Sequence, residues 1–577
     1  HRVDRRQRQM CIRDRKYAWS GLLCIGVEVV LEITVPLLMA DLIDYGVTNA
    51  DGTYIIKKGL QMALCAVLAL ILGVGSAKFS ALAGQGLGAN IRKAEYEKLQ
   101  SYSFSNIDHF SVSSLVTRLT SDVTNIQNAV STGMRPFGRS PVMLIFATSF
   151  AFRINSTLAL VFLVALPTLA VLLILIIINV GPLYGRMQSA IDQVNRCIQE
   201  NLTAIRVVKS YVRGDYEVEK FGVVNENLKS ESEKAFGTAV LNMPAMQFVM
   251  YGTILGILLI GGRLINEGQM MIGQLTSFLS YVLLILNSLM MMSNVFLLMT
   301  RSLASAERIM EVIDEKIDIT DENAKDIAVA KGEIEFDHVW FKYKDTAKEY
   351  VLSDVSFHIR PGQTVGIIGQ TGSSKTTLVQ LIPRLYDVTK GEVKIDGINV
   401  KEYPVRHLRD SVAMVLQKNT LFSGSLIDNL RWGNEKATLD EIKEACQIAC
   451  VDEFVDRLAD GYDTEMGQEG VNVSGGQKQR ICIARAILKK PKVLILDDST
   501  SAVDTATEAK IRSGLAEKLP DMTKIIIAQR ISSVRHADQI IIMDRGHVEA
   551  IGTHESLLRD NQIYQEIYAS QKEGADL

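Results

Sequence analysis

The stretch TVGIIGQTGSSKTTL, residues 364–378, decides the fold of the second half of the chain. A short β-branched strand, Thr364–Ile368, is followed by a glycine-rich loop and by an apolar helix from Leu378. In such a loop, backbone N–H groups surround a phosphate, Lys375 reaches the outer phosphates and the Thr376 hydroxyl can ligate Mg²⁺. The predicted nucleotide-binding residues here are Gly369, Gln370, Thr371, Gly372, Ser373, Ser374, Lys375, Thr376 and Thr377.

Short β-branched strands alternate with helices from Gly332 onward, which is typical of an α/β domain with a largely parallel sheet. One strand, VLIL at 493–496, ends in Asp497 and Asp498, where a carboxylate can bind Mg²⁺ beside the phosphate loop. Before it stands VSGGQKQR, residues 473–480, a loop that opens a helix and presents backbone donors to an anion. The predicted binding residues of this second loop are Ser474, Gly475, Gly476 and Gln477.

The first half contains six apolar runs, each close to the roughly 20 residues that a bilayer requires. They are residues 17–40, 59–87, 133–152, 158–180, 239–265 and 272–298. The stretches 88–132 and 181–238 are long, polar and rich in Lys and Arg, so they are expected to face the cytoplasm together with the C-terminal half. The sequence therefore predicts an all-α membrane domain of six transmembrane helices with long cytoplasmic extensions.

Charge and composition limit the partners. The net charge of −3 argues against nucleic acid, whose binding needs a strongly basic face.

Residues 1–15 show no pattern that continues into the rest of the chain, and we predict a sequencing artefact there. The alternative is an N-terminal arm, a basic amphipathic helix on the membrane surface.

Two acidic residues lie inside the first apolar run. Glu28 and Glu32 are four residues apart and so share one helical face, where a carboxylate is costly unless it faces protein, water or a cation. They are either contacts for a cationic substrate or satisfied structural groups, and the sequence leaves both interpretations open.

Further motifs surround the nucleotide site: Tyr343, Gln417 in VLQ at 415–417, and STSAVD at 499–504. With these, the chain from residue 16 onward resembles a half-transporter of the ATP-binding-cassette exporter family, of the multidrug or lipid exporter type. The resemblance implies a transmembrane domain at 16–311, a linker at 312–331 and, at 332–577, an α/β P-loop ATP-binding domain with a helical subdomain. It also implies that Tyr343 stacks on adenine and that Thr376, Gln417 and Asp497 hold Mg²⁺.

Three residues depart from the family pattern at the chemistry. Asp498 stands for the catalytic Glu, and its shorter side chain withdraws the carboxylate from the attacking water by roughly 1 to 1.5 Å, where a 1 Å error costs about 100-fold. Gln529 stands for the switch His and cannot transfer a proton. Ser374 replaces a Gly, at a cost of about 1 kcal/mol if its φ is positive. We expect this site to bind ATP and to hydrolyse it slowly.

In this family each ATP lies between the P-loop of one chain and the Ser-Gly-Gly loop of the other. The resemblance implies a second half-transporter as partner, and a heterodimer is favoured because a homodimer would carry Asp498 and Gln529 in both sites. The expected function is ATP-driven export of amphipathic, drug-like or lipid-like compounds that are hydrophobic or cationic. The protein is expected to be a multi-pass protein in the lipid of the cell membrane. The alternative is a non-hydrolysing regulatory or channel-like subunit gated by ATP.

Overall fold

The computed structural model describes residues 2–344 and 346–573. It forms two compact units: the chain up to Gln100 together with Ser113–Asp314, and Ser101–Val112 together with the chain from Glu315. Residue 1 and the side chains of residues 2–14 lie outside the described residues, so the prediction for residues 1–15 stays a prediction.

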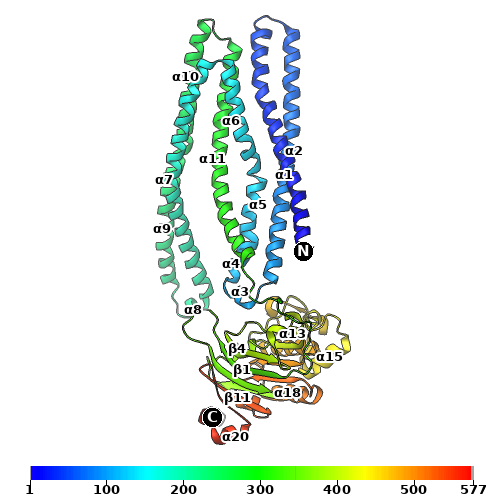
Figure 1. Cartoon of the computed structure of the whole chain (residues 1–577). Helices are drawn as coiled ribbons and strands as arrows, with labels where there is room; N and C mark the ends of the chain where they lie inside the picture. Colours follow the sequence, from blue (N-terminus) through cyan, green and yellow to red (C-terminus); the bar gives the residue numbers. More distant parts are fainter. Residues whose placement is uncertain (1, 345, 574–577) are drawn as a thin grey trace. The chain divides into compact units, whose positions relative to one another are not determined.

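The first unit is helical, and four of the six predicted apolar runs lie within one of its long helices, while run 133–152 begins one residue before α6 and run 239–265 begins at the end of α9 and continues through α10. These are α1 (Arg2–Asp41), α2 (Gly52–Gln100), α6 (Met134–Ile154), α7 (Ser156–Thr203), α10 (Asn242–Asn266) and α11 (Ile272–Asp314). The other helical elements of this unit are η1 (Leu42–Val47), α4 (Val112–Thr117), η2 (Arg118–Asp122), α5 (Val123–Ser131), α8 (Ile205–Ser210) and α9 (Gly214–Val240). Figure 1 shows α1 beside α2 and α7 beside α9 over much of their length.

Four helical stretches in the described part of the chain are long and apolar enough to cross a bilayer. They are Arg15–Val47, Gly52–Gln100, Gly214–Asn266 and Ile272–Met292. Helix α6 carries Arg135, Arg139 and Arg153 within its apolar sequence, and the count of six spans stays a prediction.

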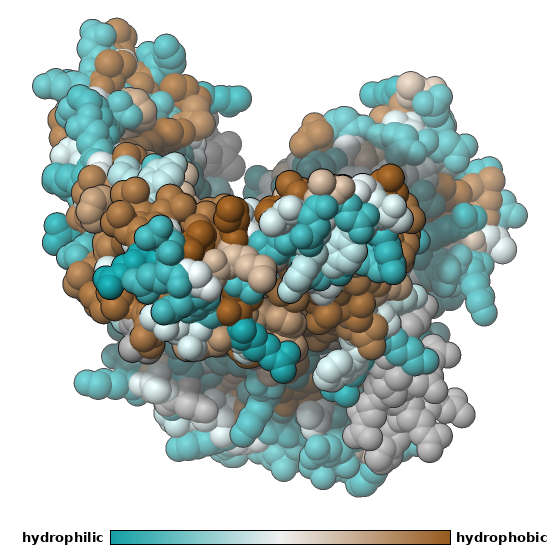
Figure 2. Space-filling model, turned by 90° about the horizontal axis from the view of Figure 1, so that it is seen from above, coloured by the Kyte–Doolittle hydropathy of each residue, from teal (hydrophilic) through white to brown (hydrophobic). Residues whose placement is uncertain are grey.

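Apolar side chains cover the outside of these helices. Leu60, Leu64, Leu70 and Ile71 of α2 are all more than half exposed, and Figure 2 shows hydrophobic residues on the surface of the molecule. Exposed apolar surface of this extent is unfavourable in water and favourable against lipid tails. The unit is therefore built for a membrane.

Apolar and aromatic side chains from α1, α6, α7, α10 and α11 form the buried core of this unit. Phe162 and Phe278 stack with ring centroids 5.3 Å apart. Tyr281 of α11 donates a hydrogen bond of 2.7 Å to the Ile33 carbonyl oxygen of α1, which fastens these two helices together.

Within its described residues, the second unit contains two larger sheets and one small one. The six-stranded sheet has the order β12-β11-β3-β10-β9-β6 and is parallel except for β12, as predicted. Its strands are β3 (Thr364–Gly369), β6 (Val412–Val415), β9 (Val493–Asp497), β10 (Thr523–Ile527), β11 (Gln539–Asp544) and β12 (His547–Gly552). An antiparallel sheet of order β2-β1-β4-β5 contains β1 (Ile334–Phe341), β2 (Leu352–Ile359), β4 (Lys390–Ile395) and β5 (Ile398–Asn399), and β7 (Gly424–Ser425) pairs with β8 (Glu465–Met466).

The parallel sheet is apolar on both faces because its strands alternate between two cores. In β9, Val493 and Ile495 join the core shared with the antiparallel sheet, whereas Leu494 and Leu496 join the core shared with helices α15 and α17. The helices and short turns of the unit are α3 (Phe104–Asp108), α12 (Lys375–Gln380), η3 (Val400–Glu402), α13 (Val405–Ser411), α14 (Leu426–Arg431), α15 (Leu439–Ile448), α16 (Asp452–Val455), η4 (Gly461–Asp463), η5 (Gln468–Gly470), α17 (Gly475–Leu488), α18 (Thr505–Lys518), α19 (Ile531–Val534), α20 (His554–Asp560) and α21 (Gln562–Glu573). Burial on both faces explains the near-continuous apolar sequence of the strands.

The segment 101–112 packs with the second unit, although in sequence it lies within the membrane half. Ser103 and Asn106 form a capping box at the start of α3. The Asn106 amide also donates to the Lys316 carbonyl oxygen at 2.8 Å, and Tyr386 donates to Asp108 Oδ2 at 2.7 Å. These contacts explain why segment 101–112 belongs to the second unit, whereas the domain boundaries predicted from the sequence kept it in the transmembrane domain.

Candidate nucleotide site

The site lies where three neighbouring parallel strands, β3, β10 and β9, end at the same edge of the sheet. Ile527 of β10 is in register with Asp497 of β9 and with Ile367 of β3. The glycine-rich loop follows β3, Gln529 follows β10, and Asp498 follows β9. This edge is the usual place for a ligand in an open α/β sheet.

The glycine-rich loop is held closed by Lys375. Its Nζ donates hydrogen bonds to the carbonyl oxygens of Gly369 at 2.9 Å and Gln370 at 2.8 Å. A side chain at Gly369 would meet the Met543 carbonyl oxygen at 2.2 Å, so only Gly fits there. Burial lowers the pKa of Lys375, while the charges of Asp498 and Asp497 oppose that shift. The ammonium therefore sits at the position from which it can reach a phosphate.

Ser374 occupies the left-handed region, with φ 71° and ψ 22°. Because φ is positive, the strain expected from the sequence applies: a Ser here carries about 1 kcal/mol of backbone strain relative to Gly.

Thr376 and Asp497 provide the oxygens expected of a magnesium site. Thr376 Oγ1 donates to Asp497 Oδ1 at 3.0 Å, while Asp497 Oδ2 is buried and has no hydrogen-bond partner within the described residues. Burial raises the pKa of the Asp497 carboxyl, and the hydrogen bond from Thr376 opposes that shift. A buried carboxylate oxygen without a donor fits Mg²⁺ and its water ligands, so the residues present suit the ion.

Asp498 and Gln529, the two residues predicted to stand at altered catalytic positions, contact each other. Gln529 Nε2 donates to Asp498 Oδ2 at 2.9 Å, and the Asp498 amide donates to the Ile527 carbonyl oxygen at 3.0 Å. Burial raises the pKa of Asp498, and this shift is opposed first by the hydrogen bond from Gln529 and then by the charge of Lys375. The position therefore presents a short carboxylate that is already engaged by an amide.

These residues surround a cavity of about 290 Å³. Its lining consists of Thr371, Gly372, Ser374, Lys375, Thr376, Thr377, Gln417, Asp497, Asp498, Ile527 and Gln529. The structure thus brings together the glycine-rich loop, the predicted Mg²⁺ ligands and the two residues predicted to stand at altered catalytic positions.

Tyr343 stands at the side of the loop. Its hydroxyl lies 2.8 Å from Thr377 Oγ1, and its ring meets those of Phe341 and Tyr386 edge to face. The ring is partly exposed beside the phosphate loop. Stacking on adenine stays a prediction.

The Ser-Gly-Gly loop does not line this cavity. Ser474 caps α17 in a capping box with Gln477, and Ser474 and Gly475 are exposed. A side chain at Gly476 would meet the Ala502 carbonyl oxygen at 2.7 Å, which explains the second Gly. Gln479 accepts a hydrogen bond of 3.0 Å from the Ala502 amide and so ties the helix to the segment after Asp498. Ser474 and Gly475 are thus exposed at the start of α17, outside the cavity lined by the glycine-rich loop.

Sequence reasoning missed Gln571, in helix α21. Its Nε2 donates to the Gln529 carbonyl oxygen and its Oε1 accepts from the Ile531 amide, both at 2.8 Å. Gln571 therefore fixes the backbone on both sides of Arg530. No motif marks this residue in the sequence, because the contact joins positions about 40 residues apart.

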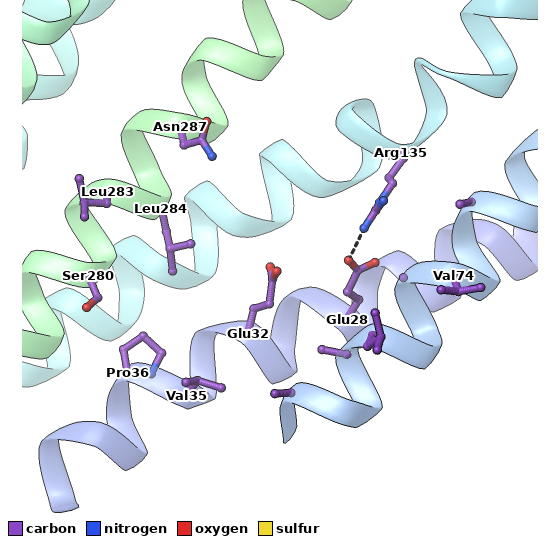
Figure 3. A pocket seen from close by; sticks show the side chains of 15 residues that line it. Glu28, Glu32, Val35, Pro36, Val74, Arg135, Ser280, Leu283, Leu284 and Asn287 are labelled. Carbon is purple, nitrogen blue, oxygen red and sulfur yellow. Dashed lines mark hydrogen bonds and ion pairs between the residues drawn. The ribbon is translucent and has the colours of Figure 1, made fainter. Parts of the chain in front are cut away.

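Glu28 and Glu32 line a separate cavity in the helical unit (Figure 3). Both contact arginines of α6, which the sequence analysis did not consider. The available signal was Arg135 and Arg139, four residues apart inside a predicted span, where a charge requires a partner.

Comparisons with known proteins agree with the two halves. Residues 19–289 match the family described as ABC transporter transmembrane region, and residues 352–501 match the family described as ABC transporter. The chain is 38% identical over 561 residues to the uncharacterized ABC transporter ATP-binding protein YfiB of Bacillus subtilis, with 97% of each covered. It is 32% identical over 571 residues to an ATP-dependent lipid A-core flippase of Pseudomonas putida, covering 96% of this chain and 94% of the other. The fold matches that of a bacterial Atm1-family ABC exporter with ATP bound, at a TM-score of 0.83 and 23% identity, covering 96% and 98% of the two chains.

Proposed function

Because the chain belongs to the ABC transporter family, as a half-transporter with its membrane domain fused to its ATP-binding domain, we propose that it exports amphipathic, drug-like or lipid-like compounds by alternating access. Members of this family are ATPase-coupled, multi-pass membrane transporters that use ATP and Mg²⁺ at a cytoplasmic domain. The observation that carries the proposal is the meeting of Lys375, Thr376 and Asp497 at one sheet edge, in a chain whose other half is covered with apolar side chains. ATP binding at that edge supplies the free energy for the change between inward-facing and outward-facing states.

The chain's own P-loop site is proposed to bind ATP and to hydrolyse it slowly. Lys375, Thr376 and Asp497 keep the chemistry of phosphate and Mg²⁺ binding, and bound Mg²⁺ neutralises phosphate charge. Asp498, however, is one methylene shorter than Glu, and its Oδ2 accepts from Gln529. A base that is both withdrawn and engaged activates water poorly.

The partner is proposed to be a different half-transporter. Ser474, Gly475 and Gly476 form the N-terminus of α17, with Ser474 and Gly475 exposed, which supports a role toward the γ-phosphate on the second chain's P-loop. A heterodimer gives the assembly one competent site, with Gly, Glu and His supplied by the partner at the positions of Ser374, Asp498 and Gln529. Two copies of this chain would have no competent base.

The Asp498–Gln529 hydrogen bond also favours a second candidate, a non-hydrolysing regulatory or channel-like subunit that ATP binding alone gates. The two functions differ in turnover. Sustained ATP-dependent transport supports the exporter, and nucleotide-gated conductance without ATP consumption supports the channel-like subunit.

The test uses the chain co-expressed with a half-transporter encoded beside it in the source DNA. The pair is reconstituted in liposomes, and we expect ATP-dependent accumulation of a fluorescent amphiphile together with vanadate-sensitive ATPase activity. Replacing both P-loop lysines with alanine provides the inactive control. If accumulation is equal with and without ATP, the exporter function is wrong.

A further inference from the structure

A cavity of about 800 Å³ lies among α1, α2, α6 and α11 of the helical unit. Figure 3 shows Glu28 and Glu32 on α1, Arg135 on α6 and Leu283 and Leu284 on α11 around it. One part of the wall is charged, and the remainder is mainly aliphatic. The cavity therefore suits a molecule with a polar end and an apolar body.

The charged part of the wall is an ion-pair network that bridges α1 and α6. Arg135 Nη2 donates to Glu28 Oε1 at 2.6 Å, and Arg139 Nη1 donates to the same oxygen at 3.1 Å. Arg139 Nη2 lies 2.5 Å from Glu32 Oε2. Two carboxylates thus face two guanidiniums, and the network as a whole carries no net charge.

Burial divides the four groups into an inner and an outer pair. The side chains of Glu28 and Arg139 are 5% and 19% exposed, whereas those of Arg135 and Glu32 are 41% and 31% exposed. Glu28, Glu32 and Arg135 line the cavity, and the more exposed Arg135 and Glu32 offer one cationic and one anionic group to a ligand. Arg135 contacts Glu28 through one nitrogen, while a guanidinium has five N–H donors to offer.

The two arginines alter the ligand charge that this cavity favours. Glu28 and Glu32 alone would favour a cation, but the two arginines balance both charges. A ligand with a single charge would leave that charge unbalanced in a region of low dielectric constant, which is costly. A ligand that carries both signs leaves the region neutral and can contact both outer groups.

We propose that this cavity binds zwitterionic amphiphiles, with the anionic group on Arg135, the cationic group on Glu32 and the apolar chain along Val35, Val74 and Leu283. The proposal rests on the proposed export function, since it names the substrate class. Gly73 leaves room for the ion pair, because a Cβ there would meet Glu28 Oε1 at 3.2 Å and Arg135 Nη2 at 3.3 Å. Glycine lets α2 lie close against the ion pair.

The test measures binding to the full-length protein, with its partner, in an uncharged maltoside detergent and without nucleotide. Three photoreactive probes share one alkyl chain and carry phosphocholine, trimethylammonium or phosphate. We expect the phosphocholine probe to label the cavity helices at concentrations about tenfold lower than the other two, the factor expected from one additional charged hydrogen bond. Equal labelling by all three probes, or a preference for either singly charged probe, overturns the proposal.

Two substitutions should change the preferred charge of the probe in opposite directions. Glu32→Gln leaves the network positive and should shift the preference toward the phosphate probe, whereas Arg135→Gln leaves it negative and should shift it toward trimethylammonium. Glu267→Gln, which removes a carboxylate paired with Arg263 on the exposed end of α10, is the matched control and should change nothing. A shift in the same direction for both cavity variants contradicts the proposal, and if a variant does not fold, the wild-type ranking of the probes still decides.

Transport by the reconstituted pair is measured separately. Transport driven by ATP without a preference for the zwitterionic probe would overturn the substrate class and leave the exporter function intact. A zwitterion preference that reverses with the two variants, without ATP-driven transport, would overturn the exporter function and leave the binding site intact.

Discussion

Gln529 Nε2 donates a hydrogen bond of 2.9 Å to Asp498 Oδ2, so the two residues predicted to depart from the family's catalytic pair contact each other. The amide keeps Asp498 oriented but occupies one of its oxygens. A glutamate at position 498 would supply a longer carboxylate, and a histidine at position 529 would supply a group able to transfer a proton.

Restoring both residues should therefore restore hydrolysis at this site. We expect the double variant Asp498→Glu with Gln529→His to turn over about 100-fold faster than the wild-type site, the factor associated with correcting a 1 Å displacement. Single-turnover ATP hydrolysis is measured in the pair whose partner P-loop lysine is alanine. An unchanged rate would mean that the impairment has another cause, and Gln529→His alone serves as the control with the short carboxylate retained.

Gln571 should stabilise the segment that carries Gln529. Gln571→Ala removes hydrogen bonds of 2.8 Å to the Gln529 carbonyl and from the Ile531 amide, with a loss of about 2 kcal/mol in local stability. Amide hydrogen exchange across 529–534 should become about 30-fold faster. Gln565→Ala is the control, because Gln565 in the same helix bonds to the Leu558 and Arg559 carbonyls instead. Equal exchange in the two variants would show that Gln571 does not hold the segment.

Nucleotide binding should depend on pH through Asp497. Burial raises the pKa of this carboxyl above the ordinary 3.8, and Mg²⁺ binds the ionised form. The affinity for MgATP should consequently rise as pH increases through the raised pKa and then level off. Fluorescent ATP titrations at each pH measure it, with EDTA replacing Mg²⁺ as the control that lacks the carboxylate contribution. A pH profile that is the same in both conditions would exclude Asp497 as the ligand.

The nucleotide site was largely predictable from sequence, whereas its supports were not. The loop at 369–377 and Asp497 lie in local strand–loop–helix patterns, and parallel strand pairing brings their ends together. Contacts between distant segments gave no such signal: Glu28 pairs with Arg135 across 107 positions, and segment 101–112 docks through single side chains such as Tyr386. Periodicity identifies which face of a helix is apolar, but it does not identify which charge on another helix completes an ion pair.

Gly73 should be needed for its small size, in contrast to its neighbour Gly75. A Cβ at position 75 would be 3.9 Å from Cys24 Sγ, an ordinary contact, whereas at position 73 it would press on Glu28 and Arg135. We expect Gly75→Ala to stabilise helix α2 by about 0.5 to 1 kcal/mol and Gly73→Ala to be destabilising by about 1 kcal/mol through crowding. Thermal unfolding of the two variants in detergent compares them directly. Equal shifts in Tm would show that the ion pair moves without cost.

We expect Ser474 and Lys375 to act at different ATP sites of the proposed heterodimer. In a heterodimer, Ser474 serves the partner's P-loop, which is the competent site, and Lys375 serves the slow site. Ser474→Arg removes the cap of α17 and places bulk and positive charge where the partner's γ-phosphate docks, so it should abolish ATPase activity of the pair. Lys375→Ala weakens only the slow site and should reduce activity without abolishing it. Steady-state ATPase assays on the reconstituted pair compare the two variants with the control Thr438→Arg. This control removes an equivalent cap from α15, a helix outside the nucleotide cavity, and should retain activity if the protein folds. The reverse ranking, with Lys375→Ala inactive and Ser474→Arg active, would place the competent site on this chain. A purified chain that hydrolyses ATP and transports alone as fast as the pair would exclude the heterodimer.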